Sequence, residues 1–218
     1  MNKRFVYFAL AGSIALTACA QPSNGSLPAG AFTTNPARRG GSPPKPNLIA
    51  NGSFEKPTVP SGSYTEFNTG QAFTRWTVVG ANGNVAVVSD TFLFEGYAFP
   101  AGCGHQWLDL TGTSQTPTGV QQKIATVSGT TYQIAFQVGN AYAPSGNIGM
   151  TSTVLVYVNG KKIFTATNKK GKGLTHQVWQ QFSTTFLANT TAAKIKFVNG
   201  YPASYTVNGL DCVSVTPT

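Results

Sequence analysis

The sequence predicts an all-β protein built as a sandwich or a barrel. Only 10% of its 218 residues are charged, whereas 41% are hydrophobic and 11% aromatic. This composition suits strands rather than charged helices and can fill a core. The 24 Gly and 13 Pro residues interrupt the chain at short intervals, as turns between strands do. Hydrophobic residues recur with a period of two, and we find no convincing helix.

The chain between residues 47 and 130 contributes four expected strands. Each is a short run of aromatic or aliphatic residues bounded by turn-forming or polar residues. They are Trp76–Val79, Asn84–Ser89, His105–Leu110 and Val120–Thr126.

The second half shows the alternation more clearly. Over Thr131–Val138, large apolar residues alternate with polar or small ones, which predicts a strand with one face in the core. Val154–Val158 repeats the pattern, and Asn159-Gly160 is a strong two-residue hairpin turn before Lys162–Thr167. Further strands are expected at Val178–Phe186, around Ile195 and Phe197, and around Val213 and Val215. About ten strands separated by Gly-rich turns favour a two-sheet sandwich.

Residues 1–19 have the features of an export signal. Lys3 and Arg4 precede Phe5–Leu16, an uncharged apolar stretch. It has the length of a signal-peptide core and is too short to span a bilayer as a helix. Residues 20–46 hold six Pro and few large apolar residues, so they are expected to form an extended tether. The predicted domain is residues 47–218.

The end of the signal peptide resembles a bacterial lipobox, Leu16-Thr17-Ala18-Cys19. In lipoproteins of that type the chain is cut before the Cys, which then carries lipid, and acyl chains supply the membrane affinity. Ala20 in place of Asp favours the outer membrane, by resemblance to Gram-negative lipoproteins. The sequence therefore predicts lipidation at Cys19 and an envelope location. In the alternative, an ordinary signal peptidase cuts after Ala20 and a soluble protein is secreted.

The mature chain is basic. Without residues 1–19 it keeps 13 Lys and Arg against six acids, a net charge of +7, which suits nucleic acid, acidic glycans or anionic lipid. Export and the lack of a nucleic-acid motif argue against nucleic acid. The lysines are scattered, apart from Lys161-Lys162 and the cluster at 169–172, which are expected on a hairpin and its following loop.

Catalytic motifs are absent. Six acids and two His residues provide few candidates for paired acid–base groups, and no nucleophile elbow, zinc motif or phosphate loop occurs. His105 and Asp109 share one face of a predicted strand, but no nucleophile accompanies them. The sequence therefore predicts that the protein is not an enzyme.

Several sequence blocks follow one another between Asn47 and Val215. They begin at Asn47 (NLIANGSFE), Arg75 (RWTVVG), Gln106 (QWLDLTG), Thr118 (TGVQQ), Val138 (VGN), Trp179 (WQQF) and Gly209 (GLDCVSV). In this order the blocks resemble the domain-of-unknown-function family 642 of secreted proteins, whose bacterial members are often exported and anchored. The resemblance implies a galactose-binding-like jelly roll, the fold of many carbohydrate-binding modules.

The same resemblance implies a structural Ca²⁺ held by Glu55 and Asp211, which match metal-coordinating acids of related sugar-binding jelly rolls. Ca²⁺ takes about 6–8 oxygen ligands, so backbone carbonyls and water would complete the set. In the alternative, Glu55 caps a turn and Asp211 accepts backbone N–H bonds. Cys212 stands where the family usually has a second acid or amide.

Cys103 and Cys212 are the only Cys residues of the domain. An even pair in an exported protein favours a disulfide, and strand parity points both side chains away from the core. The alternative is two separate thiols.

Three expected loops are rich in aromatic and amide side chains, at 91–105, 139–150 and 199–208. Sugars offer C–H faces for stacking and hydroxyls for polar partners, and Tyr supplies a ring and a polar tip. The candidate ligand-binding residues are Tyr97, Asn140, Tyr142, Tyr201 and Tyr205. In the alternative, these rings pack the loops onto the ends of the sandwich. Trp76 and Trp179 are expected in the core, and Trp107 under a loop or in a groove.

These observations favour a noncatalytic cell-envelope lipoprotein whose jelly roll binds a polysaccharide or glycan. One alternative is a structural or adhesive envelope protein that contacts other proteins, and another is a hydrolase with an unrecognised site.

Overall fold

The domain is all-β, as predicted. The computed structural model describes residues 45–143, 148–200 and 207–218, in which every regular element is a strand. None of these residues forms a helix long and apolar enough to cross a membrane. The predictions for the signal peptide, Cys19, Tyr201 and Tyr205 lie outside the described residues. Residues 43–218 form a compact unit of their own.

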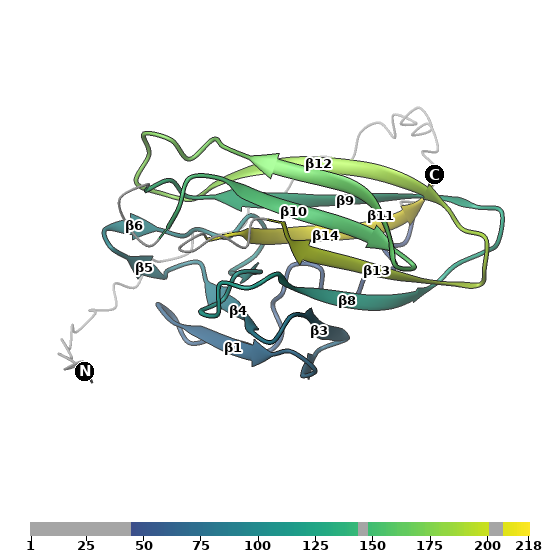
Figure 1. The fold of residues 1–218 in the computed structure, drawn as a ribbon, viewed down its shortest axis with the longest axis horizontal. Coiled ribbons are helices and arrows are strands. Elements are labelled where there is room, and N and C mark those ends of the chain that lie inside the picture. Colours follow the sequence, from purple (N-terminus) through teal and green to yellow (C-terminus); the bar gives the residue numbers. More distant parts are fainter. Residues whose placement is uncertain (1–44, 144–147, 201–206) are drawn as a thin grey trace, which may run out of the picture. The chain divides into compact units, whose positions relative to one another are not determined.

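Two antiparallel six-stranded sheets pack face to face (Figure 1). Sheet A has the order β1-β4-β7-β14-β9-β12, and sheet B has the order β11-β10-β13-β8-β3-β2. The sheet A strands are β1 (Tyr64–Asn68), β4 (Asn84–Ser89), β7 (Gln106–Asp109), β9 (Thr131–Asn140), β12 (Val178–Leu187) and β14 (Gly209–Pro217). The sheet B strands are β2 (Ala72–Phe73), β3 (Trp76–Gly80), β8 (Thr118–Ala125), β10 (Ser152–Val158), β11 (Lys161–Asn168) and β13 (Ala192–Asn199). A small hairpin, β5 (Leu93–Phe94) and β6 (Tyr97–Ala98), completes the fold.

The expected strands are all present, with ends shifted by a few residues. The sequence did not predict β1, β2, β5 and β6. Three of these are two residues long, too short to show a period, and β1 is mostly exposed at the edge of sheet A.

The main core lies between the sheets. Ile134, Phe136 and Val138 of β9 face Val154 and Val156 of β10, and all five are almost fully buried. Burial of such side chains contributes about 1.5–3 kcal/mol each. Trp76 also lies in this core, as predicted, beside Phe54 and Phe197.

A second hydrophobic cluster covers the outer face of sheet A. Trp107 is buried there under the 91–105 loop and donates its indole N–H to the Phe99 carbonyl at 3.0 Å. Of the two placements predicted for Trp107, under a loop or in a groove, the structure shows the first. The core prediction for Trp179 is wrong: its half-buried ring contacts Trp107 edge-on at 6.1 Å. Trp179 and Phe182 have opposite parity on β12, and Phe182 packs on the main core.

A disulfide joins Cys103 to Cys212, which confirms the predicted pair. It ties the 100–105 loop to an irregularity in β14, where the pairing with β9 shifts between Asp211 and Ser214. Cys212 has a positive φ of 52° at this point. The disulfide therefore fixes the loop that lies over Trp107 and Trp179.

Candidate functional site

The predicted loop residues that the structure describes serve mainly in packing. Tyr97 is half-buried in the second hydrophobic cluster. Asn140 is fully buried: its amide donates to Ser152 Oγ at 3.2 Å and its carbonyl accepts the Gly171 N–H at 2.9 Å. Tyr142 is half-buried between two buried alanines. Asn140 thus links the end of β9 to the start of β10 and to the loop after β11.

The aromatic residues of the 91–105 loop form a continuous series of ring contacts. Phe92 contacts Phe99 at 5.8 Å, Phe99 contacts Trp107 at 6.0 Å, and Trp107 reaches Trp179. Exposed Tyr64 meets Phe92 edge-on at 5.6 Å. These contacts pack the loop on the domain, as the alternative expected, but on the outer face of sheet A and not on an end of the sandwich.

His105 pairs with Asp90 instead of Asp109. The Nδ1–Oδ2 distance is 3.1 Å, and the His side chain is 86% exposed. Asp109 is buried and accepts the Thr111 and Asn208 N–H groups at 2.9 and 3.1 Å. Burial raises the pKa of Asp109 to about 6, although these hydrogen bonds oppose the shift.

Glu55 and Asp211 hold opposite ends of one short loop. Glu55 Oε1 accepts the N–H groups of His105 and Gln106 at 2.9 and 3.0 Å. Asp211 Oδ2 accepts those of Gly102 and Cys103 at 2.9 and 2.8 Å, and Oδ1 accepts that of Cys212 at 2.7 Å. Burial raises the pKa of Asp211 to about 7, and the negative charge of Glu55 adds to the shift.

These two acids also fit a cation in their charge and remaining acceptor capacity. A carboxylate has about four lone-pair positions, and the N–H bonds take two on Glu55 and three on Asp211. A cation would also offset the repulsion between the two charges. The described residues contain no cluster of three or more His, Cys, Asp or Glu side chains, so most ligands would be backbone carbonyls and water.

The outer face of sheet B presents a row of side chains that crosses five strands in register. Lys162 of β11 lies opposite Tyr157 of β10, which pairs with Lys196 of β13. Gln121 of β8 and Thr77 of β3 continue the row. The Lys196 ammonium lies 4.4 Å from the centre of the Tyr157 ring, a cation–π distance. With strands about 4.8 Å apart, the row spans about 19 Å.

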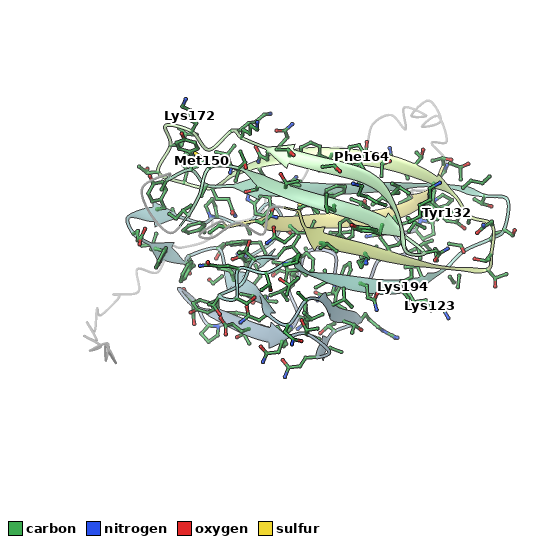
Figure 2. All side chains as sticks on the ribbon, in the orientation of Figure 1. Lys123, Tyr132, Met150, Phe164, Lys172 and Lys194 are labelled. Atoms are coloured by element: carbon green, nitrogen blue, oxygen red, sulfur yellow. A yellow bond between two sulfur atoms is a disulfide. The ribbon has the colours of Figure 1, made fainter. Side chains whose placement is uncertain are left out.

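A groove of about 270 Å³ lies beside this row. It is lined by Arg75, Thr77, Gln121, Gln122, Lys123 and Lys194. Figure 2 shows Lys123 and Lys194 close together, and the two residues are direct partners in the β8–β13 pairing. Gln122 is already bound through its amide to the backbone of Ala50, at 2.8 and 3.0 Å. The groove therefore combines three cations with the hydroxyl of Thr77 and the amide of Gln121.

Sequence reasoning missed this face, although a signal was present. Val120 and Ile124 predict the inward face of β8, and Ile195 and Phe197 predict that of β13. The opposite parity places Gln121, Lys123, Lys194 and Lys196 on the outward face. Strand order was the missing information, because only pairing brings these residues beside Thr77 and Tyr157.

Solved structures similar to the chain include three carbohydrate-binding modules. TmCBM61, solved with β-1,4-galactotriose, is 17% identical, with a TM-score of 0.47 over 79% of this chain and 99% of that one. A family 35 module from Clostridium thermocellum is 14% identical, with a TM-score of 0.42 over 70% and 97% of the two chains. CBM35 from Paenibacillus barcinonensis is 18% identical, with a TM-score of 0.39 over 71% and 99%.

No curated protein matches the sequence. The family model described as "Protein of unknown function (DUF642)" matches residues 47–206. This match spans most of the chain and includes strands of both sheets. The chain belongs to the DUF642 family.

Proposed function

We propose that this protein is a noncatalytic envelope protein that binds a polysaccharide on the outer face of sheet B. The observation that carries the proposal is the in-register row of Lys162, Tyr157, Lys196, Gln121 and Thr77 beside the groove. The row replaces the loop residues of the sequence prediction as the candidate binding surface.

The chemistry of the row suits an extended sugar chain. The half-buried Tyr157 offers a phenol and the part of its ring that Lys196 does not cover. Rings of this kind pack against apolar C–H faces while the polar tip stays hydrogen-bonded. Gln121 and Thr77 add an amide and a hydroxyl one and two strands beyond Lys196. A small-ligand site usually combines an apolar or aromatic lining with a few placed polar groups. Here Tyr157 supplies the ring, and polar groups follow on the neighbouring strands.

The cellular part of the proposal depends on the sequence. Cleavage before Cys19 and its lipidation would anchor the protein in the outer membrane, and residues 20–46 would space the domain from the surface. Ca²⁺, if bound, would be held by Glu55 and Asp211. It would link the segment before β1 to β14, so its role would be structural.

A glycan array on residues 43–218, with Ca²⁺ and with a chelator, tests the proposal. We expect saturable binding to one class of glycan, weakened by Tyr157→Ala or Gln121→Ala. Tyr64→Ala is the matched control, because Tyr64 is an exposed tyrosine on sheet A. If a folded domain binds no glycan, the proposal is wrong and the protein-contact alternative takes its place. If only Tyr97→Ala or Tyr142→Ala abolishes binding, the ligand lies at the loops.

A further inference from the structure

The strands of the two sheets differ in their charged residues: sheet A has one exposed acid, Glu66, and two buried ones, whereas sheet B has only cations. The strands of sheet A contain Glu66, Asp109 and Asp211 but no Lys or Arg. The strands of sheet B contain five lysines but no acid: Lys123, Lys161, Lys162, Lys194 and Lys196. The other three acids of the chain, Glu55, Asp90 and Glu95, lie outside the strands. Sheet B therefore presents positive charge without a carboxylate of its own.

The groove concentrates this charge at a cost to the fold. Lys123 and Lys194 are directly opposed on neighbouring strands, an arrangement of like charges that destabilises a sheet. Arg75 enters the same groove from the β2–β3 turn, where Thr74 and Arg75 have φ values of 31° and 74°. The two-residue hairpin turn between Phe73 and Trp76 requires these positive values. They are unfavourable for Thr and Arg, and the turn is what brings Arg75 to the groove. A bound anion would offset the repulsion among the three cations.

We propose that the groove binds the anionic groups of an acidic polysaccharide, an inference that rests on the proposed function and names the class of glycan. A carboxylate, sulfate or phosphate ester would lie among Arg75, Lys123 and Lys194, and the attached sugars would follow the row past Gln121 toward Tyr157. Arg matches the planar geometry of carboxylate and phosphate, whereas Lys acts as a point charge. A polymer of repeating charged sugars fits better than a single ion, because positive charge continues to Lys196 and Lys162 along the 19 Å row, about four strand spacings.

Calorimetric titration with three polymers that share one backbone tests this proposal. The probes are dextran, carboxymethyl-dextran and dextran sulfate, so only the charge and its chemical type differ. We expect both charged polymers to bind residues 43–218 at least about tenfold more tightly than dextran. A preference for one of them identifies the anionic group.

Two triple variants with equal net charge separate the groove from general attraction. Arg75→Gln/Lys123→Gln/Lys194→Gln should weaken binding about tenfold or more, whereas Lys169→Gln/Lys170→Gln/Lys172→Gln should change it less than about threefold. The second set is exposed, and Figure 2 places Lys172 at the opposite end of the domain from Lys123 and Lys194. All six are surface changes, and thermal unfolding of each variant checks that it folds.

Equal losses of polymer affinity in the two triple variants would overturn the proposal, since the attraction would then depend only on net charge. So would binding of dextran as tight as that of the charged polymers, or no binding of any polymer. Binding to anionic phosphatidylserine vesicles but to none of the polymers would assign the groove to lipid and also overturn it. If the domain binds a neutral glycan on the array and Tyr157→Ala weakens that binding, the proposed function stands and this inference falls. If neither experiment shows binding, both fall.

Discussion

At Arg75 the backbone and the side chain have opposite requirements. The φ of 74° favours Gly, whereas the groove contains the Arg side chain. We expect Arg75→Gly to raise the free energy of unfolding by about 0.5–1 kcal/mol, because relief of the left-handed strain exceeds the added entropy of Gly. The same change should weaken binding of the acidic polymer. Urea unfolding measures the first effect, and a lower stability of the variant would show that the turn is not strained.

At Asp109 burial controls the charge. Its pKa rises from 3.8 to about 6, since desolvation outweighs the N–H bonds. The folded protein then binds this proton more tightly than the unfolded chain between about pH 4 and pH 6. The contribution of Asp109 to the free energy of unfolding is therefore fully present below pH 4 and is lost as the pH rises through 6. The free energy of unfolding changes by on the order of 3 kcal/mol over this range.

The variant Asp109→Asn isolates this effect, because the amide carbonyl can still accept the Thr111 and Asn208 N–H groups. The variant should gain stability relative to the natural protein as the pH rises from 4 to 7, and urea unfolding at several pH values measures the difference. A difference in stability that stays constant over this range would show that Asp109 titrates normally in the fold.

Among the elements, the 100–105 loop is tied down from several directions. The disulfide holds Cys103, Asp211 and Glu55 hold its N–H groups, and Trp107 and Trp179 lie beneath it. The crosslink spans 109 residues, so its loss should lower the free energy of unfolding by about 2–5 kcal/mol.

The double variant Cys103→Ser/Cys212→Ser tests this value by urea unfolding with and without reductant. The reduced natural protein and the double variant should unfold at nearly the same urea concentration. Unchanged stability after reduction would contradict the account.

Calcium is predicted to act on the same elements. If Glu55 and Asp211 share a cation, millimolar Ca²⁺ should raise the melting temperature, because a ligand that binds only the folded state stabilises it. Glu55→Gln should abolish the increase, and Glu66→Gln is the matched control on the exposed face of β1. A melting temperature that does not respond to Ca²⁺ would show that the two acids bind no cation and only accept N–H bonds.

The strands could be predicted from the sequence where one face is buried. The valines of β10 and the apolar residues of β9 alternate because one face meets the core. The proposed binding surface could not be predicted in this way, since Lys123 and Lys194 are 71 residues apart and meet only through the β8–β13 pairing. Trp179 was misplaced for a related reason, because the sequence does not show that a loop covers the outer face of sheet A.

At the scale of the whole domain, the two outer faces differ in cover and in charge. Loops held by aromatic contacts and a disulfide cover part of sheet A, whose strands have no Lys or Arg and one exposed acid, Glu66. Sheet B carries cations and a groove. Because the exposed lysines of the strands all lie on sheet B, a polyanion would meet this face first, and the attraction would speed the encounter.

The most direct test of the central claim is ¹H–¹⁵N chemical-shift mapping of residues 43–218 during titration with a dextran sulfate oligosaccharide. The account predicts saturable shifts that concentrate at Thr77, Gln121, Lys123, Tyr157, Lys194 and Lys196 on sheet B. Shifts confined to the loops around Tyr97 and Tyr142, or spread evenly over all exposed lysines, would contradict it.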